Sequence, residues 1–266
     1  MREFIVYNRI KLRDCLRLPD SWGKIAWYSY TKYRRKAEKE NPPGHNVLMT
    51  GILQTIVSKN KSFMDEAVKL VKENVPEDTI LCLTGAALCD IGYYEEGLER
   101  LRKAVAIEPS LENMVVLAGY IEKPEDYAEK LELSNRILQK NPDDTDGLRH
   151  KAFVLVEYGQ LDEAEELLRK ALDVSPKNRA NKEALGEIMF RRGSYKEALQ
   201  LYKKAYSFLD KSKYSWQQIA LCYSELGKPK KAKKAAYRLL KLAKQDGDDL
   251  NTPSKKALFG KFGIAL

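Results

Sequence analysis

The chain has 266 residues, of which 44% are apolar and 32% charged, so it has enough apolar material for a folded core. It has no run of about 18 apolar residues, which excludes a membrane-spanning helix. Residues 1–9 also lack the apolar stretch of a secretory signal. Glycine and proline are sparse, which favours an all-α protein, and we expect it in the cytoplasm.

The net charge of +9 is unevenly distributed along the chain. Residues 1–43 carry +6, residues 44–178 carry −9, and residues 179–266 carry +12. Basic ends can attract phosphates or acidic partners, and the basic end of one molecule can meet the acidic middle of another. The pattern therefore suggests a salt-sensitive self-association. The alternative is that the charges only keep the outer faces of helices solvated.

Residues 1–43 do not fit the pattern of the rest of the chain. A helix is predicted over residues 21–40, because Pro19 precedes it and Pro42-Pro43 ends it. Aromatic residues on this helix are interleaved with basic ones. The helix could cap the end of a helical stack, bind nucleic acid by stacking and phosphate contact, or touch a membrane surface. Its candidate anion-binding residues are Lys24, Arg34 and Arg35.

A pattern of about 34 residues returns in residues 78–109, 145–176 and 179–210. Each copy has a small residue early, a glycine in a central turn and an alanine late. Small residues let two helix backbones approach closely, and glycine adopts the left-handed conformation that ends a helix. The early residues are Gly85, Ala152 and Gly186, the turn residues Gly92, Gly159 and Gly193, and the late ones Ala104, Ala171 and Ala205.

This pattern resembles the tetratricopeptide (TPR) repeat. The resemblance implies an all-α, right-handed superhelical solenoid of stacked antiparallel helix pairs. Residues 213–238 continue the register and residues 45–76 form a weaker copy, so we expect five repeats, or six with the weak one. The predicted segments are a basic, aromatic-rich helical segment (1–43), the solenoid (44–247), and a C-terminal loop with a short helix or mobile tail (248–266).

Residues 111–142 form the least regular repeat. Lys130 and Ile137 stand where small residues are expected, and Pro124 lies near the turn. Neighbouring repeats carry the cooperativity of a solenoid, so a poor joint here should divide the molecule into an upstream unit, residues 1–110, and a downstream unit, residues 143–266.

The second helix of the last repeat is predicted to be strongly basic. Its apolar residues repeat at helical spacing from Ala232, and lysines occupy the positions between them. This pattern is typical of a solvated helix face, but it could also bind an anion. The candidate residues are Lys230, Lys231 and Lys234.

No catalytic or metal-binding constellation is found. His45 and His150 lie far apart, no glycine-rich phosphate loop or zinc spacing is present, and the four cysteines suit small apolar fillers. Function by binding is therefore favoured over catalysis, with no cofactor and no metal.

The TPR resemblance implies that the concave face, formed by the first helix of each pair, holds a segment of a partner protein. The lysine-rich clamp of chaperone-binding members is absent, because its positions carry Cys82, Ala86, Glu183 and Ala184. The remaining positions mix carboxylates with aromatic rings, which suits a basic or aromatic peptide. The candidate residues are Arg149, Phe153, Glu157, Glu183, Glu187, Phe190, Arg191, Tyr214 and Gln217.

We therefore expect a non-enzymatic protein–protein interaction scaffold. The alternative is nucleic-acid (RNA) binding through the basic N- and C-terminal segments.

Overall fold

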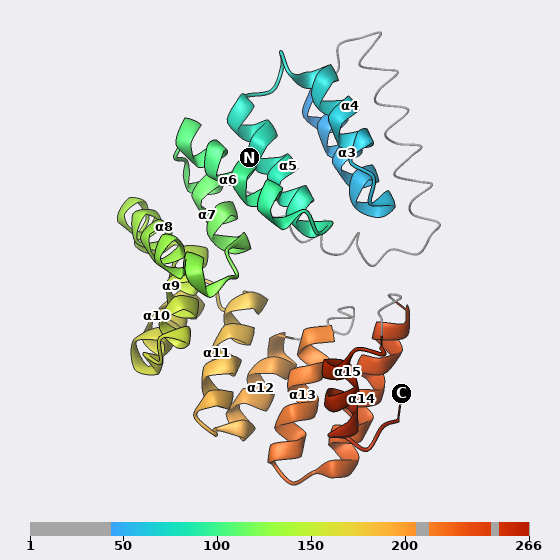
Figure 1. Cartoon of the computed structure of the whole chain (residues 1–266). Helices are drawn as coiled ribbons and strands as arrows, with labels where there is room; N and C mark the ends of the chain where they lie inside the picture. The colour runs from blue at the N-terminus through green and yellow to red at the C-terminus, as the bar shows by residue number, and fades with distance from the viewer. Residues whose placement is uncertain (1–43, 206–212, 246–249, 266) are drawn as a thin grey trace. The chain divides into compact units, whose positions relative to one another are not determined.

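A computed structural model describes residues 44–205, 213–245 and 250–265 (Figure 1). These residues form thirteen α-helices and one short 3₁₀ helix, and contain no strand. The all-α prediction is therefore confirmed. The predicted helix over residues 21–40, with Lys24, Arg34 and Arg35, lies outside the described residues.

The chain divides into two compact units, Met1–Lys140 and Asn141–Leu266. The described part of the first unit holds three helix pairs, namely α3 (Gly44–Ser58) with α4 (Ser62–Val71), α5 (Glu77–Asp90) with α6 (Tyr94–Ile107), and α7 (Leu111–Tyr120) with α8 (Tyr127–Lys140). The second unit also holds three, namely α9 (Thr145–Glu157) with α10 (Leu161–Val174), α11 (Arg179–Arg191) with α12 (Tyr195–Ala205), and α13 (Lys213–Glu225) with α14 (Pro229–Gln245). Helix α15 (Pro253–Gly260) follows them.

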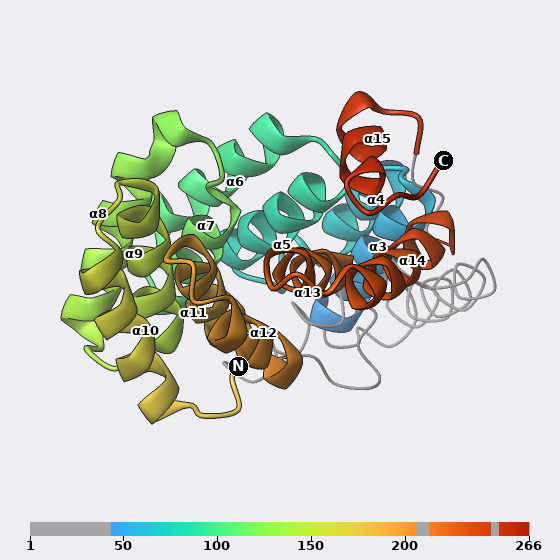
Figure 2. The ribbon, with the colours of Figure 1, turned by 90° about the horizontal axis from the view of Figure 1, so that it is seen from below.

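Figure 1 shows the two helices of pairs such as α5 with α6 and α13 with α14 side by side and antiparallel, and Figure 2 shows the same elements from below. The weak copy upstream is thus a true helix pair, which makes six repeats. The predicted segment boundaries at residues 43 and 247 stay predictions, and the division after Lys140 is additional to them.

The predicted turn glycines end the first helix of four pairs. Gly92, Gly159, Gly193 and Gly227 have φ values of +97°, +79°, +76° and +65°. In the first of these turns the Tyr93 N–H donates to the Leu88 carbonyl at 2.9 Å, and the other three turns repeat this bond. This bond closes a Schellman motif and satisfies a carbonyl at the helix end, so the glycine serves the backbone conformation.

Small residues, the predicted Gly85 and also Gly97 on α6, allow close helix approach. A Cβ added to Gly85 would lie 2.8 Å from the Gly97 carbonyl oxygen, and one added to Gly97 would lie 2.4 Å from the Cys89 sulfur. Ala171 and Ala205 are buried, with 0% and 4% of their surface exposed. The register of the repeat is therefore the one predicted.

Side-chain caps begin three of the first helices. The side chains of Ser110, Asp144 and Asn178 accept hydrogen bonds from backbone N–H groups in the first turns of α7, α9 and α11. Each satisfies a donor that the helix start would otherwise leave unpaired. The three caps are spaced at the period of the repeat.

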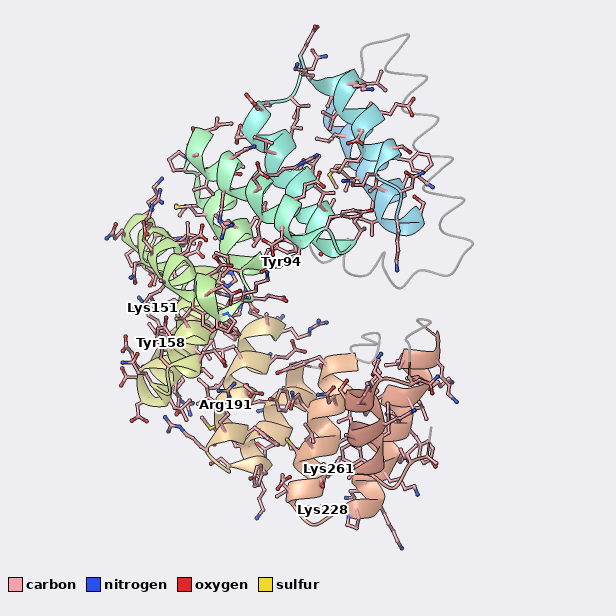
Figure 3. All side chains as sticks on the ribbon, viewed as in Figure 1. Tyr94, Lys151, Tyr158, Arg191, Lys228 and Lys261 are labelled. Carbon is pink, nitrogen blue, oxygen red and sulfur yellow. The ribbon has the colours of Figure 1, made fainter. Side chains whose placement is uncertain are left out.

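Polar contacts hold the two helices of the irregular repeat together and connect it to the repeat before it. The buried Lys130 donates to the carbonyl of Ile121 at 2.9 Å, just after the end of α7. The Tyr94 hydroxyl, labelled in Figure 3, donates to the carbonyl of Tyr120 at 2.7 Å. The chain divides directly after α8, the second helix of this repeat, so the repeat belongs to the upstream unit, which extends to Lys140 and not to residue 110 as predicted.

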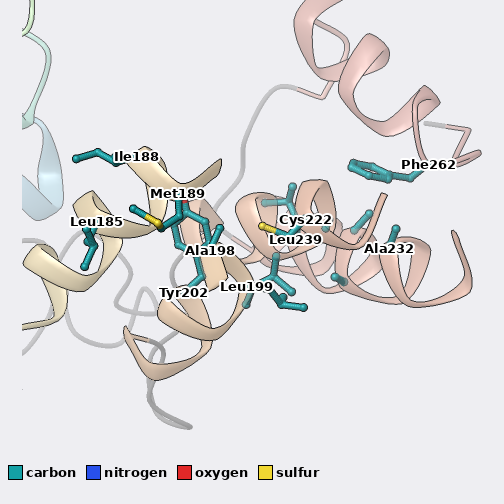
Figure 4. Close-up of a cluster of buried hydrophobic side chains, with 14 of the residues drawn as sticks. Leu185, Ile188, Met189, Ala198, Leu199, Tyr202, Cys222, Ala232, Leu239 and Phe262 are labelled. Atoms are coloured by element: carbon teal, nitrogen blue, oxygen red, sulfur yellow. The ribbon is translucent and has the colours of Figure 1, made fainter. Parts of the chain in front are cut away.

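Each unit has its own buried core. In the first unit, two clusters lie among α3–α5 and among α5–α8. In the second unit, one cluster extends from Ala152 on α9 to Ile264 (Figure 4). Phe259 on α15 and Phe262 just after it belong to that cluster, so the C-terminal segment packs onto the last repeats.

Candidate functional site

Nine predicted site residues lie on α9, α11 and α13, the first helices of the three pairs in the second unit. We call this set the A-helix face: Arg149, Phe153, Glu157, Glu183, Glu187, Phe190, Arg191, Tyr214 and Gln217. The structure joins several of them through direct contacts.

Arg191, which is labelled in Figure 3, connects α11 to α9 through a hydrogen bond to Glu157. Its Nη2 donates to Glu157 Oε1 at 2.7 Å, and its Nε donates to Glu187 Oε1 at 3.0 Å. Partial burial acts to lower the pKa of Arg191, but the hydrogen bonds and charges of these two carboxylates outweigh it and raise the pKa. Arg191 is therefore a permanent cation between two carboxylates.

Glu187 connects α11 to the next repeat. Its Oε2 accepts hydrogen bonds from the hydroxyls of Tyr202 at 3.2 Å and Tyr214 at 3.4 Å. Tyr202 is fully buried against Gly186, whose added Cβ would lie 3.0 Å from the ring. Burial and nearby charges, Glu187 among them, raise the pKa of Tyr202 above the ordinary 10.0, so this tyrosine stays neutral at physiological pH.

Glu183 makes the second link between α11 and α13. Its Oε1 accepts a hydrogen bond from the Ser215 hydroxyl at 2.7 Å and lies 3.7 Å from Arg179 Nε. Ser215 is fully buried. These contacts hold the carboxylates of the A-helix face in fixed positions.

Two aromatic rings of the A-helix face remain exposed. Phe153 is 38% exposed and Tyr214 is 44% exposed. Phe190 instead packs edge-on against Tyr195, with ring centroids 5.2 Å apart. Arg149 forms an ion pair with Asp146, and Gln217 is half-buried. The face thus offers exposed apolar surface beside a polar network whose carboxylates are largely engaged.

The corresponding residues of the first unit are small and buried. Cys82 and Ala86 belong to the core cluster among α5–α8. Burial and neighbouring carboxylates raise the pKa of the Cys89 thiol to about 12, so this sulfur is a poor nucleophile at neutral pH. The cysteines of the described residues form no disulfide, and the burial of Cys82 and Cys222 suits the predicted filling role.

The part of the chain that the structure describes contains no group of three or more His, Cys, Asp or Glu side chains arranged to hold a metal ion. None of its helices is long and apolar enough to cross a membrane.

Of the six candidate anion-binding residues, Lys24, Arg34 and Arg35 lie outside the described residues and the other three lie within them. Lys230, Lys231 and Lys234 lie on α14, and all three are exposed.

The pairing of the residues of the A-helix face was not predicted from the sequence. Glu157 and Arg191 lie 34 residues apart, so they occupy equivalent positions in successive repeats. Opposite charges at this period are a signal that could have predicted the ion pair. Tyr202 and Ser215 gave no such signal, because their roles depend on side-chain direction.

Comparisons with known proteins identify the class. Residues 157–239 match the family described as anaphase-promoting complex, cyclosome, subunit 3. A TPR repeat-containing protein of Dictyostelium discoideum is 39% identical over 79 residues, which are 29% of this chain and 30% of that protein. The chain thus matches about a third of that relative's length.

Two solved structures share the fold. A thermophilic TPR protein of Thermus thermophilus matches with a TM-score of 0.60 and 18% identity, over 71% of this chain and 100% of that one. A tetratricopeptide repeat protein of Parabacteroides merdae matches with a TM-score of 0.58 and 15% identity, over 83% and 99%.

The helix pairs, turn glycines and small contact residues define stacked helical repeats of the TPR type. The chain is a tetratricopeptide-repeat protein, and this fold commonly serves protein–protein interaction.

Proposed function

We propose that the protein is a non-enzymatic scaffold that binds a segment of a partner protein over the A-helix face of its second unit. The observation that carries the proposal is the exposure of the Phe153 and Tyr214 rings beside an ordered network of side chains. The match to a family described as a subunit of a multiprotein complex supports a role in assembly.

The network around Arg191 preorganises the side chains of the A-helix face for binding. Its contacts join α9, α11 and α13, so the carboxylates lose little freedom when a partner arrives. Exposed aromatic rings on such a rigid support are the usual anchors of an interface. The partner segment should therefore place apolar or aromatic side chains on Phe153 and Tyr214.

A preference for basic partners would depend on the carboxylates of Glu183 and Glu187, but both already have partners within the protein. Glu187 is already paired with Arg191, and Glu183 accepts a hydrogen bond from Ser215. Apolar contact should therefore contribute more to affinity than charge pairing. The proposal keeps the cytoplasm as location, which suits the thiols of Cys82, Cys89 and Cys222, since none of them is in a disulfide.

The test places a photo-crosslinking amino acid at position 153 or 214 of the full chain. A third version carries it at Tyr93, which is 45% exposed but lies in the first unit. Crosslinked partners are identified by mass spectrometry. The same partner segment should crosslink from positions 153 and 214 but not from 93.

Affinity for that segment is then measured with Phe153→Ala and Tyr214→Ala, with Tyr93→Ala as the matched control. Each change on the A-helix face should weaken binding by about 1–2 kcal/mol, and the control should not. All variants are checked for an unchanged circular dichroism spectrum. Equal affinity of all three would show that the partner binds elsewhere.

A further inference from the structure

The most strongly charged surface of the described residues lies at the end of the second unit. In residues 213–245 and 250–265, twelve lysine and arginine residues stand against one carboxylate side chain, Glu225. That carboxylate pairs with Lys261 at 3.1 Å. Residues 226–245 contain no acidic residue. Most of these positive charges belong to α14.

The two faces of α14 differ sharply. Its apolar side is buried against the core, through Ala232, Ala235, Ala236, Leu239, Leu240 and Ala243. The residues that alternate with these at spacings of three and four share the opposite side and are exposed. They form a single row along the helix: Lys230, Lys234, Tyr237, Lys241 and Lys244.

This row, which we call the α14 lysine row, is about 21 Å long at the rise of an α-helix. None of its four lysines forms an ion pair with another described residue. Tyr237 lies in the middle of the row and is 51% exposed. Lys233 approaches that ring, with its Nζ 6.0 Å from the centroid.

The cations beside the row are held on aromatic rings. The guanidinium carbon of Arg238 lies 4.6 Å from the centroid of the Trp216 ring. The Nζ atoms of Lys203 and Lys231 lie 5.2 and 5.9 Å from the centroid of Tyr223. These contacts keep positive charge close to the row. The added charge lowers the affinity of this surface for cations and raises its affinity for a polyanion.

We infer that the α14 lysine row binds single-stranded nucleic acid. Lysines are point charges that contact phosphates without reading bases. The central tyrosine supplies a ring on which an unpaired base can stack, and the lysines on either side then meet the flanking phosphates. A membrane is less suited, because the apolar side of α14 is buried and cannot insert. An acidic polypeptide would use the charges but would leave the exposed ring without a role.

Fluorescence anisotropy with a labelled 20-nucleotide oligouridylate tests this inference on the full chain. The comparison ligands are a duplex of the same length and polyglutamate. Wild-type affinity should fall steeply between about 50 and 200 mM salt. The oligouridylate should bind more tightly than polyglutamate at each salt concentration.

Two changes separate charge from stacking. Replacing Lys230, Lys234, Lys241 and Lys244 by Gln should reduce affinity at least tenfold and lower the salt slope by about 3, since each phosphate contact contributes about 0.7. Tyr237→Ala should weaken binding by about 5- to 100-fold through lost stacking, whereas Tyr237→Phe should keep it.

The matched control replaces four exposed lysines of the first unit, Lys69, Lys72, Lys103 and Lys140, by Gln. It has the same net charge as the row variant and should bind like wild type. Absence of binding at 50 mM salt, or an equal loss in both quadruple variants, would overturn the inference. The row would instead bind an acidic protein if polyglutamate bound with the same affinity as the oligouridylate and if Tyr237→Ala left that affinity unchanged.

Discussion

At the scale of single residues, glycines of this protein serve two different physical needs. Gly92 and Gly193 have positive φ, and an added Cβ at either would meet nothing within 4 Å. Gly97 lies in a helix, and an added Cβ would meet the Cys89 sulfur at 2.4 Å and the Gly85 carbonyl at 2.7 Å. The first need is conformational and the second is steric.

Alanine substitutions should separate the two needs. Gly92→Ala and Gly193→Ala should each destabilise by about 1–2 kcal/mol, the cost of the left-handed conformation. Gly97→Ala should cost about 1–3 kcal/mol or more, because α5 and α6 must move apart. Gly260→Ala, with open space and an ordinary φ, is the control and should change stability by less than about 0.5 kcal/mol. Urea unfolding measures all four, and equal effects at all sites would contradict this account.

The buried Tyr202 predicts a loss of stability in alkali. Its folded-state pKa lies above the ordinary 10.0, chiefly through burial. Above pH 10 the unfolded chain therefore releases a proton that the native state keeps, and stability present below that pH is lost as pH rises. Each such group contributes up to about 1.4 kcal/mol per pH unit.

Tyr202→Phe should accordingly lose stability less steeply between pH 10 and 12 than wild type. Urea unfolding at a series of pH values measures the slope. The matched control, Tyr158→Phe, changes a ring that is 54% exposed and should keep the wild-type slope. Parallel curves for wild type and Tyr202→Phe would show that this hydroxyl does not govern the alkaline response.

At the scale of helices, the starts of α7, α9 and α11 each depend on a short polar side chain. Asp144 accepts hydrogen bonds from the N–H groups of Asp146 and Gly147, at 3.1 and 2.9 Å. Asn178 accepts one from Asn181 at 3.2 Å. Asp144→Ala and Asn178→Ala should each cost about 1 kcal/mol in urea unfolding.

Asp143→Ala provides the control for the caps. Asp143 is exposed and its carboxylate pairs with Lys170 at 3.0 Å, so its loss should cost less than about 0.5 kcal/mol. If it proved as harmful as Asp144→Ala, charge and not capping would be responsible.

The sequence predicted the repeat well because small residues and turn glycines are fixed by local geometry. Gly85, Gly92 and Ala171 each occupy the place that their size or conformation requires. The caps at Ser110, Asp144 and Asn178 were missed, although short polar residues at a 34-residue spacing before apolar helices are a readable signal. The tyrosines that hold Glu187 were not predictable, since hydroxyl direction depends on the packed neighbours.

At the scale of the whole molecule, the division after Lys140 separates two sets of buried side chains. The clusters of the first unit lie between Val47 and Ile137, and the cluster of the second lies between Ala152 and Ile264. In repeat proteins, stability is approximately the sum of repeat terms and nearest-neighbour terms. A change in one core should therefore act mainly on its own unit.

Two matched overpacking variants test this independence. Ala104 belongs to a cluster of the first unit and Ala198 to that of the second, and both are fully buried. Replacement of either by Leu should destabilise by about 1–3 kcal/mol. Native-state hydrogen exchange should show that Ala104→Leu lowers protection mainly in residues 44–140, and that Ala198→Leu does so mainly in residues 141–265. Ala106→Leu, on the exposed side of α6, is the control for added bulk and should leave protection unchanged. If both core variants lowered protection uniformly from residue 44 to residue 265, the two units would unfold as one cooperative body.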